Sequence, residues 1–273
     1  MRSGGTQRLF GRHVRLALAL LLVIPMLVAG RALAPDTRAA TPSALRFDGV
    51  GSYVKVNDSP SLRIPVNLTI EAWVKPEGVT GHQHIAGKNR YEIGIEPSGD
   101  GFLVVFHFKS DNRWKTVVSG RYPLNAWYHV AGAYDGSNMR LWVNGQRVAS
   151  REITGTIDQT DNPFRIGSAN AADDYFDGVI DEVRVSNTVR YTSNFVPAQE
   201  PFVPDAFTAG LWHLDEGAGT AVEDASGNGN TGKLQNGPEW VSESPFQGPD
   251  LVAPKISDVQ ATNLSTSATI TWT

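Results

Sequence analysis

Apolar and polar positions alternate along the chain from Leu45 to about Val185, and short polar turns interrupt the alternation. A period of two is typical of β-strands, because successive side chains of a strand point to opposite faces. The clearest runs lie at residues 67–76, 101–110, 127–136, 139–150, 163–168 and 178–187. Helical periodicity is slight, and we expect at most one helical turn, near residues 187–195. Many short strands separated by turns predict an all-β fold, a sandwich or a barrel.

The last third of the chain carries weaker apolar runs between two linkers. Residues 196–208 hold three prolines and no period, so we expect a linker or a surface loop there. Short apolar runs follow at 209–217 and 232–241, and residues 242–254 form a second linker. Residues 255–273 alternate again, but so short a segment cannot bury a core alone.

The first forty residues differ from the rest in charge and hydropathy. Basic residues within positions 2–15 precede an apolar run at 16–30, and small residues follow at 32–34. This order is typical of a secretory signal peptide, and the apolar run is short for a membrane span and contains Pro25. We therefore predict that residues 1–40 are a signal peptide and leader. The alternative is an uncleaved membrane anchor.

Composition narrows the classes of partner and chemistry. The chain has 24 Lys and Arg against 28 Asp and Glu; the first forty positions hold six of the former and one of the latter, leaving 18 against 27. So acidic a protein argues against nucleic acid and anionic lipid as partners. The sequence contains no cysteine, which excludes disulfides, thiolate catalysis and cysteine-ligated zinc.

Three segments of the chain carry a combined signature. They are "ALRFDGVGSYVKV" at 44–56, "TIEAWVKPEG" at 69–78 with "AWYHVAGAYDGSNMRLWVNGQRV" at 126–148, and "FDGVIDEVRVSNTVRYTSNF" at 176–195. Together they resemble the LamG-like jelly-roll family, within the concanavalin A-like lectin/glucanase group. The resemblance implies two antiparallel sheets packed face to face as a jelly-roll sandwich.

Residues 210–241 resemble the front end of the same family, although here they follow the strand that normally comes later. Two explanations are open: a circularly permuted sandwich in which residues 207–241 supply edge strands, or the start of a second jelly roll. We favour the permutation, because a proline-containing linker rather than another "FDG" strand follows Val241. The predicted jelly-roll domain then spans residues 41–241.

The last segment resembles the first strands of a fibronectin type III domain. Within residues 255–273, Trp272 stands where that family keeps its core tryptophan. The resemblance implies an incomplete spacer domain after the linker at 242–254.

The polar stretch "DASGNGNTG" at 224–232 is a candidate calcium site. Calcium prefers six to eight oxygen ligands, and Asp224, Asn228 and Asn230 offer such oxygens among glycines that permit tight turns. The resemblance places this segment beside the strand with "IDEVR", so Asp181 is the expected second carboxylate. Asp181 falls in phase with the valines of "VIDEVRV", on an otherwise apolar face where it needs a partner or a metal. The alternative is that these residues form Asx turns.

Two polar regions are candidates for ligand binding. Carbohydrate sites commonly combine an exposed aromatic platform with amide and carboxylate groups. Trp114 lies among charged and amide neighbours, which makes it the best exposed candidate, although a core position is the alternative. Asp173, Asp174 and Tyr175 form a polar loop, either the rim of a site or a solvated turn.

The sequence offers no recognisable catalytic constellation. Glucanases of this group carry alternating acids along one strand, whereas here valine stands at 179 and the acids Asp181 and Glu182 are adjacent. Adjacent strand residues point to opposite faces, so the acid pair that glycoside hydrolysis requires is missing there. His82 and His84 are the only closely spaced histidines, and we interpret them as a loop feature. We expect no enzymatic activity.

These observations predict a secreted, non-catalytic binding or adhesion module with a structural calcium site. Its expected partner is a glycan or an extracellular protein surface. The alternatives are a purely structural or adhesive segment of a larger surface protein, or an accessory region of an extracellular glycoside hydrolase.

Overall fold

The computed structural model describes residues 43–168 and 173–246. The predicted signal peptide and leader, at residues 1–40, lie outside the described residues. So does the fibronectin-like segment at 255–273, and both therefore stay predictions.

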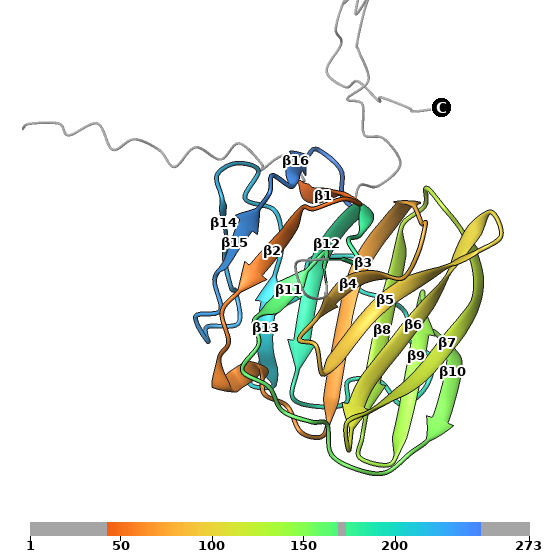
Figure 1. Cartoon of the computed structure of the whole chain (residues 1–273). Helices are drawn as coiled ribbons and strands as arrows, with labels where there is room; N and C mark the ends of the chain where they lie inside the picture. The colour runs from red at the N-terminus through yellow and green to blue at the C-terminus, as the bar shows by residue number, and fades with distance from the viewer. Residues whose placement is uncertain (1–42, 169–172, 247–273) are drawn as a thin grey trace, which may run out of the picture. The chain divides into compact units, whose positions relative to one another are not determined.

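The described residues form strands joined by turns (Figure 1). The strands are β1 (Ala44–Asp48), β2 (Tyr53–Val56), β3 (Leu68–Gly78), β4 (Gln83–Gly87), β5 (Tyr91–Ser98), β6 (Gly101–Ser110), β7 (Arg113–Pro123), β8 (Tyr128–Tyr134), β9 (Asn138–Val143), β10 (Gln146–Glu152), β11 (Phe164–Ile166), β12 (Asp177–Ser186), β13 (Thr208–Trp212), β14 (Ala221–Val222), β15 (Gly232–Gln235) and β16 (Glu239–Val241). One 3-10 turn, η1 (Pro60–Leu62), accounts for the helical content of this part of the chain. The helical turn expected near residues 187–195 is wrong, since that segment is irregular.

The strands form two antiparallel sheets of eight strands each within the described residues. The first sheet runs β10-β9-β8-β3-β12-β1-β16, with β13 also paired to β12. The second sheet runs β14-β15-β2-β11-β4-β5-β6-β7. Figure 1 shows β5, β6 and β7 lying over β8, β9 and β10. The predicted all-β, two-sheet jelly-roll sandwich is confirmed.

The strands after residue 207 belong to the same two sheets. β16 pairs with β1, and β15 pairs with β2. β1 therefore lies between β12 and β16, and β2 lies between β11 and β15. These pairings join the strands after residue 207 to the same sandwich as β1 and β2 and not to a second one, and the circular permutation stays a prediction.

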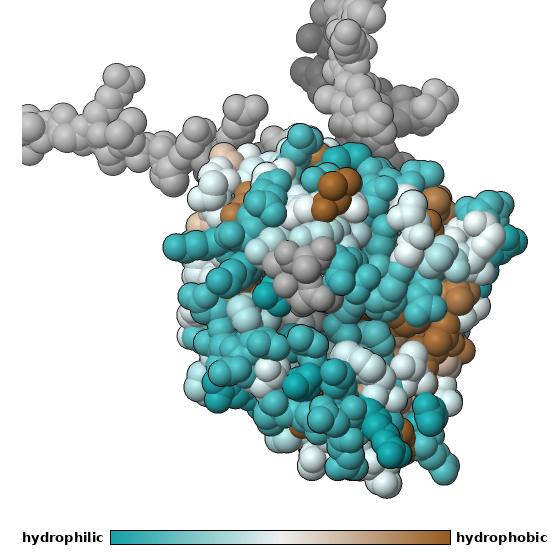
Figure 2. Space-filling model, viewed as in Figure 1, coloured by the Kyte–Doolittle hydropathy of each residue, from teal (hydrophilic) through white to brown (hydrophobic). Residues whose placement is uncertain are grey.

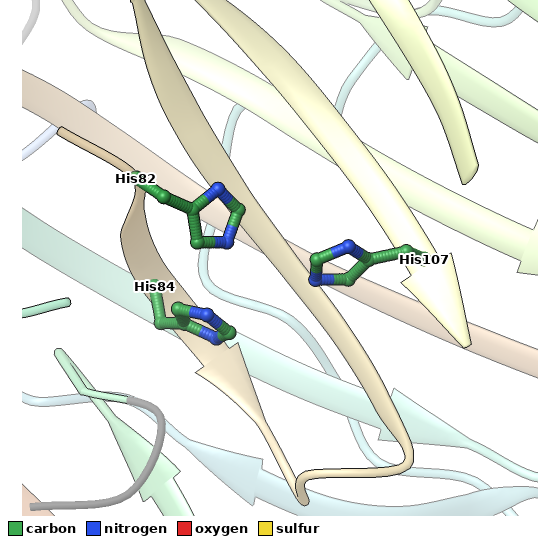
Figure 3. Close-up of side chains that lie close together, drawn as sticks. All are labelled: His82, His84 and His107. Atoms are coloured by element: carbon green, nitrogen blue, oxygen red, sulfur yellow. The ribbon is translucent and has the colours of Figure 1, made fainter. Parts of the chain in front are cut away.

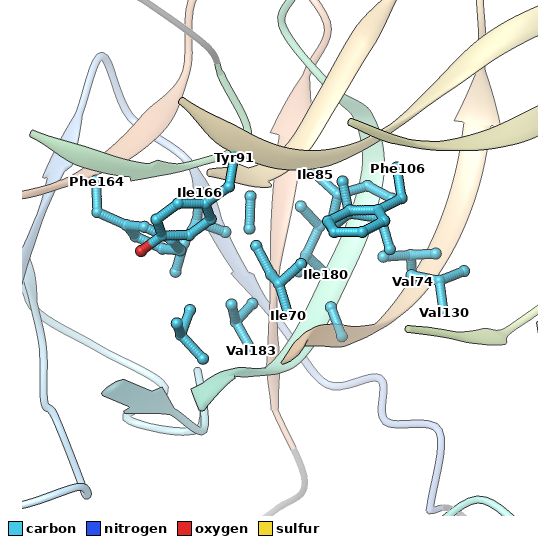
Figure 4. Packing of buried hydrophobic residues seen from close by; sticks show 14 of the residues in the cluster. Ile70, Val74, Ile85, Tyr91, Phe106, Val130, Phe164, Ile166, Ile180 and Val183 are labelled. Carbon is cyan, nitrogen blue, oxygen red and sulfur yellow. The ribbon is translucent and has the colours of Figure 1, made fainter. Parts of the chain in front are cut away.

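The core lies between the two sheets (Figure 4). Ile70 and Val74 of β3 and Ile180 of β12 face Ile85 of β4 and Phe106 of β6, and all five are fully buried. Such alternation of buried and outward side chains is what the period of two in the sequence predicts. Burial of this many large apolar side chains supplies the main stabilisation of a domain without disulfides.

A β-bulge in β12 changes the expected direction of one side chain. Ile180, Val183 and Val185 all face the core, so the alternation breaks between positions 180 and 183. Glu182 has a φ of 52°, and the register with β3 shifts between Asp181 and Arg184. The expectation that Asp181 shares the face of Val183 and Val185 is therefore wrong, because the bulge's extra residue reverses the phase. Asp181 lies on the outer side of the first sheet, opposite Trp73.

The outer faces of the two sheets differ. On the first sheet, Phe202 packs against Trp73, and Phe195 packs near Trp142, so segments after β12 cover this face. Hydrophilic residues cover most of the face seen in Figure 2, where β5, β6 and β7 lie toward the viewer. This open, polar face of the second sheet carries the candidate site.

Candidate functional site

A pocket of about 290 Å³ lies on the outer face of β4, β5, β6 and β7. Its lining consists of His82, His84, Asn89, Glu92, His107, Lys109, Trp114 and Asp174. Strand alternation produces this face: Phe106 and Phe108 point into the core, so His107 between them points outward. The volume lies just below the usual range for small-molecule pockets, about 300–1,000 Å³. It suits one small ligand.

Three histidines converge in this pocket (Figure 3). His82 precedes β4, His84 belongs to β4, and His107 comes from β6. One ring nitrogen from each lies within 4.8 Å of those of the other two. The sequence interpretation of His82 and His84 as a loop feature is wrong for His84, which lies within β4. It also missed His107, which lies more than twenty residues further along the chain.

A glycine on the intervening strand lets these rings meet. Gly94 of β5 pairs with His84 and lies on the same face as Glu92, two residues before it. A Cβ at Gly94 would lie 2.5 Å from the carbonyl oxygen of Gln83. Because position 94 has no side chain, the space over β5 stays open to the rings from β4 and β6.

Glu92 is the buried carboxylate beneath the histidines. It lies opposite His107 in the register of β5 with β6 and is 3% exposed. Its Oε2 lies 2.7 Å from Nδ1 of His84, and its Oε1 lies 2.8 Å from Nε2 of His107. Burial raises the pKa of Glu92, but the imidazoles of His107 and His84 outweigh burial and bring it to about 2. The carboxylate is therefore ionised at neutral pH and lies within ion-pair distance of one nitrogen of each ring.

His82 is held mainly in its neutral form. Burial, together with His84 and His107, lowers its pKa below the ordinary value of histidine. Its Nδ1 lies 3.3 Å from Oε1 of Glu96. A neutral imidazole has a nitrogen lone pair, so His82 can accept a hydrogen bond or bind a metal at neutral pH.

Trp114 forms one wall of the pocket and is 42% exposed. Its ring stacks on His107 with a centroid distance of 4.7 Å and an angle of 28° between the planes. The ammonium of Lys109 lies 4.7 Å from the centroid of the Trp114 ring, as a cation–π pair. Trp114 is thus exposed rather than part of the core.

The structure brings one of the three predicted loop residues to Trp114. Asp174 lines the same pocket; its carbonyl accepts a 2.9 Å hydrogen bond from the His84 N–H, and its Oδ2 lies 3.8 Å from Nε2 of His84. Tyr175 packs beside Tyr53 instead, with ring centroids 6.4 Å apart. Asp173 is exposed and, like Tyr175, is not part of the pocket lining.

The predicted calcium residue Asp224 is surrounded by protein donors. Its Oδ1 accepts hydrogen bonds from the N–H groups of Leu211, at 3.1 Å, and Ser226, at 2.9 Å. Its Oδ2 accepts from the Ser226 hydroxyl and the Asn230 N–H, both at 2.8 Å. These contacts are those of an Asx-type turn that is hydrogen-bonded to β13.

Asn228 and Asn230 lie in the same turn and contact the same strand. The side-chain amide of Asn228 donates to the carbonyl of Thr208 at 3.0 Å, and that of Asn230 donates to the carbonyl of Ala209 at 2.9 Å and to the Ser61 hydroxyl at 3.0 Å. The Oδ1 of Asn230 is buried without a hydrogen-bond partner among the described residues. It is an acceptor that remains for a cation or a water molecule.

Asp181 has other neighbours than this turn. It is 3% exposed, and its Oδ1 accepts a 2.9 Å hydrogen bond from the Glu182 N–H. Glu182 contacts His213 at 2.6 Å and accepts a 2.7 Å hydrogen bond from the Phe202 N–H. Within the described part of the chain, no hydrogen bond connects Asp181 to Asp224. The structure therefore assembles Asp224, Asn228 and Asn230 in one turn and places Asp181 in a separate cluster.

The described residues contain no helix with the length and apolar character needed to cross a bilayer.

A comparison with curated proteins gives no match. Solved structures do match. A protein of Bacteroides ovatus to which carbohydrate binding is ascribed aligns with a TM-score of 0.59 and 22% identity, over 73% of this chain and 59% of its own. This chain therefore spans 59% of the length of that protein, and the likeness at this identity shows a shared fold.

Two further solved structures are similar over about half of the chain. Domain 4 of an extracellular arabinanase from Geobacillus stearothermophilus, in complex with arabinotriose, has a TM-score of 0.43 and 24% identity, over 52% of this chain and 69% of its own. The CBM40 domain of a Ruminococcus gnavus sialidase, bound to sialyllactose, has a TM-score of 0.41 and 14% identity, over 56% of this chain and 95% of its own.

The family itself is shown by the sequence. The profile of the concanavalin A-like lectin/glucanases superfamily matches residues 48–193, from the end of β1 through β12 and the segment after it. That match covers more than half of the 273 residues, and its strands build both sheets of the sandwich. The chain belongs to the concanavalin A-like lectin/glucanases superfamily.

Proposed function

We propose that this domain is a carbohydrate-binding module and that the pocket on β4–β7 is its site. The observation that carries the proposal is the exposed ring of Trp114 beside the polar side chains of Asn89, Lys109 and Asp174. Sugar rings present apolar C–H faces and polar edges, so they bind where an aromatic face adjoins hydrogen-bonding groups.

The arrangement assigns a role to each side of the pocket. Trp114 offers an apolar surface. The ammonium group of Lys109 can move away from the indole ring and donate hydrogen bonds to sugar hydroxyls. Asn89 supplies both a donor and acceptors, and Asp174 supplies acceptors. The small volume favours recognition of one sugar unit, either at a chain end or as a branch.

The similar Bacteroides ovatus protein, to which carbohydrate binding is ascribed, supports the same class of ligand. The proposal is for a non-catalytic domain that acts outside the cytoplasm. The prediction of export rests on the order of basic, apolar and small residues within residues 1–40. A structural calcium ion at Asp224, Asn228 and Asn230 belongs to this proposal as a separate prediction, argued in the Discussion.

A glycan array followed by calorimetric titration of the bound sugar tests the proposal. Trp114→Ala should weaken binding by about tenfold or more, which corresponds to about 1.4 kcal/mol. The matched control is Phe207→Ala, which removes another exposed aromatic ring, 54% exposed and outside the pocket. If no glycan binds above background, or if both variants bind like the native protein, the pocket is not a carbohydrate site and the structural or adhesive alternative is favoured.

A further inference from the structure

We infer that the same pocket contains a binding site for a divalent transition-metal ion such as Zn²⁺, with His82, His84 and His107 as ligands and Asp174 as the fourth. This inference does not depend on carbohydrate binding, since an ion can occupy the histidines with or without a sugar. A bound ion gives a reason for the convergence of the three rings, which stacking and strand pairing do not explain.

The first argument is the convergence of the three rings. One nitrogen from each lies within 4.8 Å of the others. His84 of β4 and His107 of β6 lie on either side of β5, and His82 directly precedes β4. In a tetrahedral site with Zn–N distances of about 2.0–2.1 Å, ligand nitrogens lie about 3.4 Å apart. Small rotations of the side chains close this difference, and His82, whose side chain is 24% exposed and precedes the strand, has room to move.

The second argument is the buried carboxylate behind two of the rings. Metal-binding histidines usually direct their other nitrogen to a carboxylate, which fixes the tautomer and orients the ring. Glu92 contacts Nδ1 of His84 and Nε2 of His107, and these contacts leave Nε2 of His84 and Nδ1 of His107 for another partner. Glu92 is 3% exposed and lies behind both rings, which is the position that such an orienting carboxylate occupies.

The third argument concerns the fourth ligand. Oδ2 of Asp174 lies 3.8 Å from Nε2 of His84, close to the separation of two ligands on one zinc ion. The hydrogen bond from the His84 N–H to the Asp174 carbonyl anchors this residue beside β4. Imidazole and carboxylate ligands together favour zinc, copper or nickel, whereas calcium takes oxygen ligands.

Titration of the metal-free protein with ZnCl₂ in a calorimeter tests the inference. The protein must be purified without a polyhistidine tag, which would itself bind zinc. We expect one ion per chain with micromolar or tighter affinity, and a higher melting temperature with zinc than with chelator. Loading with Co²⁺ should produce the d–d absorption bands of a tetrahedral site, which report the geometry independently of affinity.

Variants separate the ligands from their surroundings. His82→Ala and His107→Ala should each abolish binding, and Glu92→Gln should weaken it by about 10- to 100-fold. The matched control is His213→Ala, which removes a histidine with its own carboxylate partner, Glu182, outside the pocket. Circular dichroism checks that each variant is folded, and His82 tolerates change best because it precedes the strand.

Three outcomes decide the matter. Absence of zinc binding by the native protein, or binding that survives in both His82→Ala and His107→Ala, overturns the inference. If Asp174→Asn binds zinc with full affinity while His82→Ala does not bind zinc, Asp174 is not one of the ligands. Zinc titrated without sugar, and the glycan titrated in the presence of chelator, measure the two sites separately, so a failure of the metal site and a failure of the carbohydrate site give different results.

Discussion

Asp181 shows how a single carboxyl group responds to its place in the fold. It is 3% exposed on the outer side of the first sheet, beside Glu182. Burial, and next the charge of Glu182, raise the pKa of Asp181 to about 9. The group is therefore protonated at neutral pH in the folded protein, whereas it is ionised in the unfolded chain, where its pKa is near the ordinary 3.8.

This difference predicts how the stability depends on pH. Between pH 4 and 9 the folded state binds a proton that the unfolded state does not, so Asp181 makes stability fall as the pH rises, by at most about 1.4 kcal/mol per pH unit. Asp181→Asn places a neutral amide there and keeps an acceptor for the Glu182 N–H. We expect the variant to match the native protein near pH 4 and to become progressively more stable than it toward pH 9.

Urea unfolding at several pH values measures this effect. Asp100→Asn is the control, because Asp100 is an exposed carboxylate paired with the exposed Arg121, and such surface pairs contribute little. A stability difference between Asp181→Asn and the native protein that stays constant from pH 4 to 9 would contradict the raised pKa.

At the scale of elements, hydrogen bonds to the Asp224 carboxylate attach the polar turn after β14 to β13. Four protein donors contact its two oxygens, and the Ala225 N–H also donates to the carbonyl of Leu211. A buried or half-buried acceptor that satisfies backbone N–H groups is costly to remove, because those donors lose their partner.

We therefore expect Asp224→Ala to lower the free energy of unfolding by about 1–3 kcal/mol even when a chelator is present. Thermal melting of both proteins, each with calcium and with chelator, provides the measurement. The calcium prediction has its own outcome in the same experiment: chelation should lower the melting temperature of the native protein and not that of the variant. If chelation changes the melting temperature of neither protein, Asp224 stabilises the turn through its hydrogen bonds alone. If Asp224→Ala does not lower the melting temperature in chelator, these hydrogen bonds do not stabilise the turn.

The sequence predicted elements more reliably than contacts between them. Alternation identified the strands because it records which face of each strand is buried. Alternation also turns His84 and His107 outward, but it does not reveal which strands are neighbours. The zinc candidate depends on β5 lying between β4 and β6, and that is set by pairing across the sheet.

Local irregularities escaped the sequence analysis for a related reason. A β-bulge adds one residue to a strand without changing its composition, so the reversal at Glu182 left no signal in the apolar pattern. The family resemblance also placed Asp181 and Asp224 in one site, whereas their contacts belong to two different clusters. In contrast, Trp114 and Asp174 were both proposed for ligand binding, and they do line one pocket.

At the scale of the whole sandwich, the strands nearest the beginning of the domain depend on the strands nearest its end. β1 and β2 each pair on one side with β16 or β15, so both sheets need residues that follow β12. Trp212 of β13 links the two layers. It is fully buried, its ring stacks on Phe164 of the second sheet with a centroid distance of 4.9 Å, and its Nε1 donates a 2.9 Å hydrogen bond to the carbonyl of Asn230.

Trp212→Ala should therefore destabilise the whole domain and not merely its last strands. Truncating a buried tryptophan costs about 3–5 kcal/mol, through lost burial and the cavity that remains. Phe207→Ala, which lies just before β13, is the control, since its ring is 54% exposed and its loss should cost little. Urea unfolding followed by circular dichroism should show one cooperative transition in the native protein and one transition at lower urea in Trp212→Ala. A second transition that keeps its native midpoint in the variant would mean that residues 207–241 unfold separately, and the single closed sandwich would be wrong.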